Sequence, residues 1–299
     1  MNFSRSDISF ASCGQRCRGW LYLPEARGPH AVVVMAHGFG AVKEMGLDRY
    51  AERFAEAGYA CLVFDYRHFG SSDGDPRQLL DIERQLQDWA ASIAFVRSRD
   101  DLDGERLVLW GTSFAGGHAI AAGARDGSVA AVISQCPFTD GPASVRVMEF
   151  RTLLRVSWLA LRDAVRSLLG RPPLLVSTAG EPGSVAMMTA PDVLQGYLGL
   201  VPAGLEFRNE VAARIALHVL FYRPGRAAAK LPCPALFCVC EADSVAPAEA
   251  TLRHVAKAPH GEIKRYPDGH FDIYVGEPFE RVVADQLDFL QRQVLPGPA

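Results

Sequence analysis

A stretch of the chain, LVLWGTSFAGGHAI at residues 107–120, contains a serine with the neighbours that nucleophilic catalysis requires. A strand-like run precedes Ser113, small residues flank it, and a helix-forming run follows. A sharp turn between a strand and a helix lifts a serine hydroxyl above the edge of a sheet, where it can attack a carbonyl carbon. The stretch departs from the usual G-x-S-x-G spacing because Ala115 occupies the fifth position, which adds only a methyl group. We predict that Ser113 is a nucleophile.

A second serine matches that spacing literally but lacks the required surroundings. Ser72 lies within GSSDG at 70–74, several residues after a strand-like run, and Asp75-Pro76 follows it instead of a helix. Glycine, serine, aspartate and proline in such a cluster are typical of a loop. We therefore expect Ser72 to be a loop residue without a role in chemistry.

A serine is a weak nucleophile near neutral pH, so it needs a base that is oriented by an acid. Later in the chain, EAD at 241–243 follows the apolar run PALFCVC, and His270 lies in the loop RYPDGHFDIY. We predict that His270 is the base and that Asp243 is the acid, because Asp243 lies deeper in its loop than Glu241 does. Asp140 and Glu241 remain alternative acids.

The negative charge that develops on an attacked carbonyl oxygen needs hydrogen-bond donors. The residue after the predicted nucleophile, Phe114, can offer its backbone N–H. HGFG at 37–40 directly follows the apolar run AVVVMA, and its glycines on both sides of Phe39 leave the backbone free to turn the Phe39 N–H inward. We predict an oxyanion hole made by the amides of Phe39 and Phe114, with no metal and no cofactor.

The runs around these motifs alternate between strand-like and helix-like patterns. Short apolar runs such as AVVVMAH (31–37) and YACLVFDY (59–66) have the length of buried strands. LLDIERQLQDWAASIAFVRSR (79–99) spaces its apolar residues as an amphipathic helix does. Such alternation predicts an α/β fold with a mostly parallel sheet flanked by helices.

The alternation breaks at residues 141–225, which are rich in helix formers and contain no clear buried strand. We predict a helical cap there, inserted between the two parts of a core at 1–140 and 226–299, with the substrate in the crevice between cap and strand ends. The apolar residues of the cap are candidates to line an acyl pocket, although packing between cap helices explains each of them equally well. These candidates are Phe150, Leu153, Trp158 and Leu161.

Composition limits the classes of function. The chain has 299 residues, 49% hydrophobic and 22% charged, with a net charge of −3, so nothing suggests nucleic-acid binding. We find no signal-peptide pattern and no run approaching the roughly 18 apolar residues of a membrane span. The seven cysteines are irregularly spaced, and several lie in strand-like runs. We expect a reduced, cytoplasmic protein with a small-molecule substrate and no nucleic-acid or membrane partner; its oligomeric state stays open.

Taken in order, HGFG, GTSFAG, the EAD of 241–243 and the GHFD of 269–272 resemble the α/β-hydrolase superfamily. Three longer stretches, FDYRHFGSSDGDPRQLLDIERQLQDW, SQCPFTDG and RNEVAARIALHVLFYRPGR, are similar to a group of bacterial hydrolases related to fungal polyketide transferases and thiohydrolases. This resemblance implies the α/β-hydrolase fold and an acyl ester or thioester substrate whose acyl part is bulky and apolar.

The function that we expect is cleavage of a carboxylic ester or thioester through an acyl-enzyme on Ser113. Two alternatives remain. An acyltransferase would use the same triad but pass the acyl group to an alcohol, and a binding protein would keep the hydrolase scaffold without catalysis.

Overall fold

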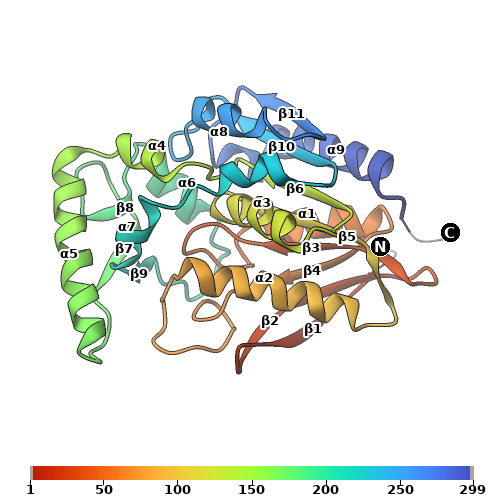
Figure 1. Ribbon diagram of the computed structural model, residues 1–299, viewed down its shortest axis with the longest axis horizontal. Coiled ribbons are helices and arrows are strands. Elements are labelled where there is room, and N and C mark those ends of the chain that lie inside the picture. Colours follow the sequence, from red (N-terminus) through yellow and green to blue (C-terminus); the bar gives the residue numbers. More distant parts are fainter. Residues whose placement is uncertain (1–2, 297–299) are drawn as a thin grey trace.

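An eight-stranded sheet forms the centre of the molecule (Figure 1). In the computed structural model, which describes residues 3–296, the strand order is β1-β2-β4-β3-β5-β6-β10-β11. β1, β2 and β4 pair antiparallel, and the remaining neighbours pair parallel, which confirms the expected mostly parallel sheet. The strands span Phe3–Ser12 (β1), Gln15–Pro24 (β2), His30–Ala36 (β3), Ala60–Phe64 (β4), Leu102–Thr112 (β5), Ala131–Gln135 (β6), Ala235–Cys240 (β10) and Gly261–Tyr266 (β11).

Both faces of this sheet are buried. Alternate side chains of β3 enter two different hydrophobic clusters, Val32 and Val34 on one face and Val33 and Met35 on the other. This alternation follows from the two-residue period of a strand, and it explains why the central strands are apolar throughout. Side chains of α2, α3 and α8 complete the first cluster, and those of α1 and α9 complete the second. These helices span Leu47–Glu56 (α1), Ile82–Arg97 (α2), Phe114–Asp126 (α3), Ala248–Val255 (α8) and Gly276–Gln293 (α9).

The segment between β6 and β10 forms the left end of the molecule in Figure 1. It contains a small sheet in the order β8-β7-β9, so the expectation of a cap without strands is wrong. Those strands have five residues or fewer, which is too short for a periodic pattern to stand out in the sequence. Its elements are α4 (Gly141–Arg146), α5 (Phe150–Leu168), β7 (Leu175–Ala179), β8 (Ala186–Met188), α6 (Val193–Gly199), β9 (Glu210–Ala212) and α7 (Ile215–Val219).

Two short 3₁₀ helices, Pro224–Lys230 and Asp272–Tyr274, complete the secondary structure of the described residues. The division into a core at 1–140 and 226–299 and a cap at 141–225 stays a prediction, and residues 1–2 and 297–299 of that core lie outside the described residues. Within the part of the chain that is described, no helix combines the length and the apolar character needed to cross a membrane.

A strained turn joins β5 to α3 at Ser113, whose φ of 57° and ψ of −119° are rare for a residue with a side chain. The next strand fixes this conformation: the Ser113 N–H donates to the carbonyl of Gln135 at 2.9 Å, and the Ser113 carbonyl accepts from the Phe138 N–H at 2.9 Å. Gly111 lets the helix approach, because a Cβ there would lie only 2.0 Å from the carbonyl oxygen of Ala115. The methyl group of Ala115 is fully buried and is accommodated.

The contact at Gly111 predicts a strong effect of one added methyl group. Gly111→Ala should lower the free energy of unfolding by about 3 kcal/mol or more, because the opposing atom is backbone and cannot rotate away. Gly199→Ala is the matched control, since nothing lies within 4 Å of its added Cβ. Urea unfolding of both variants measures the difference. Equal stability of the two variants would contradict this account of the turn.

Candidate active site

Three residues from three strand ends form a continuous hydrogen-bonded chain. The Ser113 hydroxyl lies 2.9 Å from Nε2 of His270, and Nδ1 of His270 lies 2.7 Å from a carboxylate oxygen of Asp243. The other oxygen of Asp243 accepts the N–H groups of Val245 and Ala246 at 2.8 and 2.6 Å, which orients the carboxylate. The structure therefore brings together the three residues that the sequence singled out, in the geometry of a serine, a base and an orienting acid.

The two alternative acids point elsewhere. Asp140 accepts from the Ala143 N–H at the start of α4 and lies 3.0 Å from Nε2 of His254. Glu241 pairs with Arg265 on the surface. Neither carboxylate has a described contact with His270, so Asp243 is the acid of our proposal.

The environment of His270 adjusts its basicity. Burial of the ring disfavours its charged form, but Asp243, through its charge and its hydrogen bond, and Cys136 beside the ring together outweigh burial, so the pKa of His270 is raised well above its ordinary value. A raised pKa means that the neutral ring is a stronger base toward the Ser113 hydroxyl. It also means that protonation removes the free base at a higher pH than for an ordinary histidine.

Phe39 and Phe114, whose amides we expect to form an oxyanion hole, line one cavity together with Ser113. Phe114 is the first residue of α3, where a helix leaves its N–H groups without intrahelical partners. Phe39 follows Gly38. A Cβ atom added to Gly38 would lie 3.0 Å from the Cβ of Ser113, so the loop after β3 passes directly over the serine. The Tyr197 hydroxyl of α6 donates to the carbonyl of Phe39 at 3.0 Å and fixes this part of the loop. That the amides of Phe39 and Phe114 form an oxyanion hole stays a prediction.

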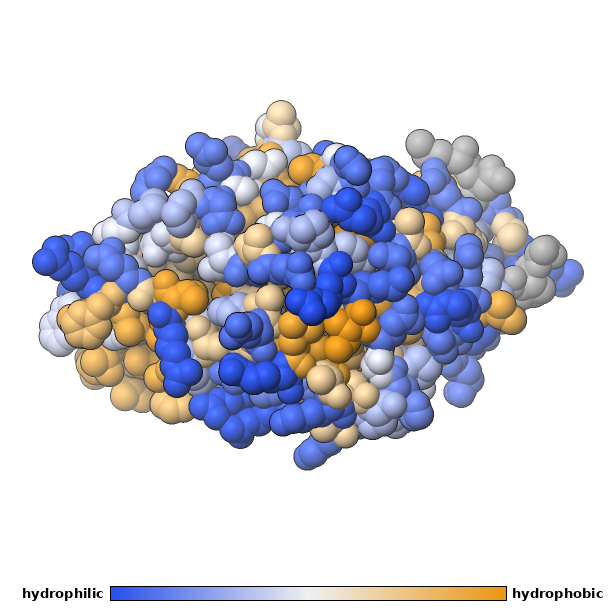
Figure 2. Space-filling view, turned by 90° about the horizontal axis from the view of Figure 1, so that it is seen from above, coloured by the Kyte–Doolittle hydropathy of each residue, from blue (hydrophilic) through white to orange (hydrophobic). Residues whose placement is uncertain are grey.

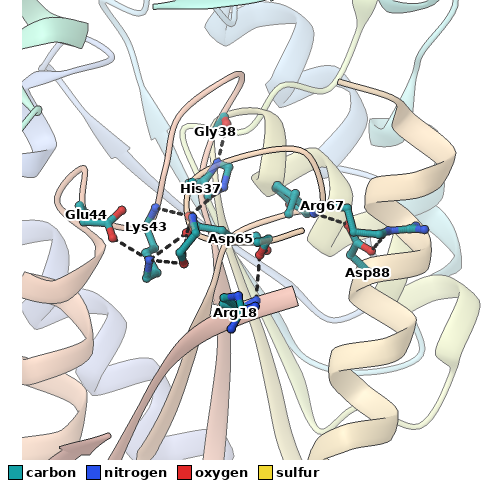
Figure 3. A network of polar contacts seen from close by, with 12 residues as sticks. Arg18, His37, Gly38, Lys43, Glu44, Asp65, Arg67 and Asp88 are labelled. Atoms are coloured by element: carbon teal, nitrogen blue, oxygen red, sulfur yellow. Dashed lines mark hydrogen bonds and ion pairs between the residues drawn. The ribbon is translucent and has the colours of Figure 1, made fainter. Parts of the chain in front are cut away.

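A buried carboxylate holds the same loop from below (Figure 3). Oδ1 of Asp65 accepts the Lys43 N–H at 2.8 Å, and Oδ2 accepts the Lys43 ammonium at 2.8 Å and the Ser71 N–H at 3.0 Å. His37 lies beside this pair and is oriented by a contact of 3.1 Å between its Nδ1 and the Gly38 carbonyl. Burial disfavours the charged form of Lys43, yet Asp65 outweighs that effect and raises the pKa of Lys43. The network ties the loop after β3 to the loop after β4.

A residue that sequence reasoning missed lies near the triad. Cys136, which follows β6 with a φ of 35°, has its sulfur within 4.8 Å of the ligand atoms of Asp243 and His270. Among the described residues this trio is the group whose side chains could hold a metal ion. However, the 2.7 Å between Asp243 and His270 is a hydrogen-bond distance, shorter than the roughly 3.4 Å between two zinc ligands. The sequence signal that could have identified Cys136 is its position directly after β6, the parallel strand beside β5.

An apolar cavity of about 350 Å³ opens beside Ser113. Aromatic and aliphatic side chains dominate its lining, together with a few hydroxyl groups; the larger ones include Phe39, Phe114, Phe138, Met148, Leu153 and Val156. Of the four cap residues suggested by the sequence, Leu153 lies on this lining.

The other three cap residues suggested by the sequence point away from the cavity. Phe150, Trp158 and Leu161 are 69%, 62% and 52% exposed and do not line it, so their expected place in the pocket is corrected. The reason is that α5 has apolar residues on two faces, and sequence periodicity alone did not tell which face turns inward.

A second cavity of about 30 Å³ touches the other side of Ser113 and His270. Its lining includes Met45, Phe271 and Tyr274. A space of that size accommodates about one or two water molecules. Ser113 therefore lines both a large apolar cavity and a small one.

Residues 27–278 match the family Hydrolase_4, described as serine aminopeptidase, S33. The chain belongs to this family. It is an α/β hydrolase, as its motifs led us to expect. The quorum-quenching protein AidA of Acinetobacter baumannii (strain MDR-ZJ06) is 53% identical to this hydrolase over 288 residues, which are 96% of this chain and 95% of that protein.

The expected relationship to fungal enzymes is also confirmed. The thiohydrolase aneE of Aspergillus aculeatus is 29% identical over 304 residues, covering 98% of this chain and 94% of that protein. A crystal structure of the α/β hydrolase GrgF from Penicillium sp. sh18 superposes with a TM-score of 0.81 at 28% identity, covering 97% of this chain and 99% of that chain. GrgF is named a polyketide transferase, so relatives of this hydrolase carry the names of both hydrolases and acyl transferases.

Removal of the Asp243 charge should change both the rate and the pH profile. Asp243→Asn should reduce kcat by ~10⁴-fold, because the ring of His270 loses its orienting acceptor. In the wild type, kcat/KM should rise with pH through the raised pKa of His270, since only the neutral ring accepts a proton. Loss of the negative charge lowers that pKa, so the acidic limb should move to lower pH.

Asp140→Asn serves as the control for this measurement, because Asp140 pairs with His254 instead. Its rate and its acidic limb should match those of the wild type when ester hydrolysis is followed as a function of pH. If the acidic limb shifts in Asp140→Asn but not in Asp243→Asn, then Asp140 is the acid and our assignment of Asp243 is wrong.

Disruption of the buried pair below the oxyanion loop should cost stability. Lys43→Met leaves the Asp65 carboxylate buried without its cation, and we expect a loss of about 3–5 kcal/mol in urea unfolding. Arg18→Met breaks the ion pair with Asp73, both of whose side chains are more than 40% exposed, and should cost about 0–1 kcal/mol. The account of the network fails if the two variants lose the same amount.

Proposed function

We propose that this α/β hydrolase cleaves a carboxylic ester or thioester with an apolar acyl group, through an acyl-enzyme on Ser113. The observation that carries the proposal is the chain of contacts from Ser113 through His270 to Asp243, at 2.9 and 2.7 Å, on the wall of an apolar cavity. Serine activated in this way attacks carbonyl carbons in many unrelated folds, so the geometry itself carries the inference.

The proposed reaction has two halves. His270 Nε2 takes the Ser113 proton as Ser113 Oγ bonds to the carbonyl carbon, and the amides of Phe39 and Phe114 stabilise the resulting oxyanion. The imidazolium then gives its proton to the leaving alcohol or thiol as the carbon–oxygen or carbon–sulfur bond breaks. In the second half, water loses a proton to His270 and attacks the acyl-enzyme, and Ser113 recovers its proton when the acid is released. Asp243 stabilises the imidazolium in both halves.

The larger cavity supports an apolar acyl group. Its volume of about 350 Å³ lies in the range of small-molecule sites, and no charged side chain is among its lining residues. Burial of each methylene of an acyl chain there would contribute ~0.8 kcal/mol to binding. The absence of a carboxylate among the described lining residues also argues against the aminopeptidase activity that the family description suggests, because a charged α-amino group would lack a partner.

The small cavity beside His270 favours water as the acceptor. Its volume of about 30 Å³ fits water better than a bulky alcohol. Transfer of the acyl group to an alcohol is the second candidate, supported by the polyketide transferase name of a relative that is 29% identical. The relative with 53% identity is named a quorum-quenching protein, which adds quorum-sensing signal molecules that contain an ester bond to the substrates worth testing.

A smaller acyl cavity should change the preference for chain length. We expect hexanoyl to decanoyl p-nitrophenyl esters to exceed acetyl in kcat/KM. Ala216→Leu fills part of the lining and should lower the decanoyl-to-acetyl ratio by about tenfold, since a methylene or two is worth about 1–3 kcal/mol in a tight pocket. Ala90→Leu, on the exposed side of α2, is the control and should leave the ratio unchanged.

Product analysis separates the candidates. With excess acceptor alcohol, a hydrolase still releases mostly free acid, whereas an acyltransferase forms the new ester. No turnover of any ester or thioester, with no labelling of Ser113 by a fluorophosphonate, would leave only a non-catalytic binding role. A preference for acetyl that Ala216→Leu does not change would refute the assignment of the cavity to the acyl group.

A further inference from the structure

The outward side of α5 carries a continuous row of exposed apolar side chains. The row, called here the outer face of α5, has members three or four residues apart along the helix, so they lie on one side of it. All are more than half exposed: Phe150, Leu154, Trp158, Leu161, Val165 and Leu168. Figure 2 shows apolar side chains gathered at the left end of the molecule, where α5 lies in Figure 1. An exposed apolar row of this length is unusual for a protein surface without a partner.

The charges beside this face are almost all positive. Residues 146–171 contain six arginines and two acids, a net charge of +4, whereas the whole chain has −3 and its remainder therefore −7. One of the two acids, Asp163, is fully buried and paired with Arg214, so it does not neutralise the surface. At 100° per residue, one flank of the outer face carries an arginine row: Arg151, Arg155, Arg162 and Arg166.

The other flank of the outer face leads to the large cavity. Leu153 and Ser157, on that flank, line the cavity. Three further lining residues, Val147, Leu220 and Phe221, are themselves 57%, 38% and 79% exposed. The mouth of the cavity therefore opens beside the outer face of α5.

A second copy of the chain fits this surface poorly. In an antiparallel pair of α5 helices, the arginine row of one copy would face the same row of the other. Because Asp163 is buried, α5 offers no exposed acid to meet those arginines in a parallel pair either. An anionic lipid surface supplies both missing parts: acidic headgroups for the arginines and an acyl layer for the aromatic and aliphatic side chains. Tryptophan, as at Trp158, is the side chain that favours such an interface.

We propose that the outer face of α5 docks on an anionic lipid surface, with the mouth of the apolar cavity beside the contact. Docking requires no membrane-spanning helix, and it revises the expectation of no membrane partner, which rested on the absence of a long apolar run. The arginine row contacts the headgroups while Phe150 and Trp158 enter the acyl layer. The binding itself does not rest on the proposed ester chemistry.

Co-sedimentation with vesicles tests the docking. The protein should bind vesicles of phosphatidylcholine mixed with phosphatidylglycerol at least tenfold more tightly than vesicles of phosphatidylcholine alone. Binding should weaken as NaCl is added, because salt screens the arginine contacts. Trp89 and Trp110 are fully buried, and Trp20 is half-buried on β2, away from α5. The emission of Trp158 should therefore dominate a blue shift on binding, and Trp158→Phe should remove most of that shift while retaining binding.

Charge-reversal variants give the decisive comparison. Arg155→Glu with Arg162→Glu should weaken binding to the anionic vesicles by at least tenfold. Arg27→Glu with Arg253→Glu, at exposed positions away from α5, makes the same change in net charge and should bind as the wild type does. Turnover of a freely soluble acetyl ester checks that both pairs fold, and failure of that activity in the wild type would overturn the proposed function without affecting the vesicle result.

Three outcomes would overturn the docking proposal: no binding to anionic vesicles, equal binding to both kinds of vesicle, or equal loss in the two charge-reversal pairs. A concentration-dependent dimer that Trp158→Ser abolishes, without vesicle binding, would assign the outer face of α5 to a second copy of the chain instead.

Discussion

The strained backbone of Ser113 is the constraint on which the candidate site depends. Its φ of 57° belongs to the turn from β5 into α3, where the Ser113 hydroxyl lies 2.9 Å from His270 and α3 begins at Phe114. One conformation therefore places both the nucleophile and one oxyanion donor of our proposal. Such a conformation costs about 1–3 kcal/mol, and hydrogen bonds to Gln135 and Phe138 at the end of β6 offset that cost. The strand next to β5 in the sheet, β6, and the residues that follow it therefore hold the turn at Ser113 in its strained conformation.

Loops around that turn are fixed by buried polar contacts rather than by regular secondary structure. Asp65 and Lys43 join the loops after β4 and β3, and the hydroxyl of Tyr197 joins the oxyanion loop to α6. A movement of the inserted segment would therefore reach Phe39 directly. In the segment between β6 and β10, α5 has two faces. Leu153 lines the cavity, and the outer face of α5 is apolar and flanked by arginines. The segment between β6 and β10 therefore contacts the large cavity, the loop after β3 and the proposed docking surface.

Much of this arrangement could be predicted from local pattern. The buried strands stand out as short continuous apolar runs, and α2 has a helical periodicity. Ser113, Asp243 and His270 each follow a strand-like run, so the carboxyl edge of a parallel sheet brings them together. The three short strands of the insertion and the inward face of α5 could not be predicted, because both depend on tertiary contacts. For that reason Phe150, Trp158 and Leu161 were candidates for the pocket beside Leu153, and only Leu153 lines the cavity. Cys136 escaped notice because a single thiol carries no pattern of its own.

The most direct test of the central claim is the detection of the acyl-enzyme. Protein mixed with excess p-nitrophenyl octanoate and quenched in acid within the first turnover would be analysed by intact mass spectrometry and peptide mapping, beside Ser113→Ala. The account predicts the added mass of one octanoyl group on the peptide that contains Ser113, together with a stoichiometric burst of p-nitrophenol, and neither signal in Ser113→Ala. An acyl group on another residue, or an undiminished burst from Ser113→Ala, would contradict it.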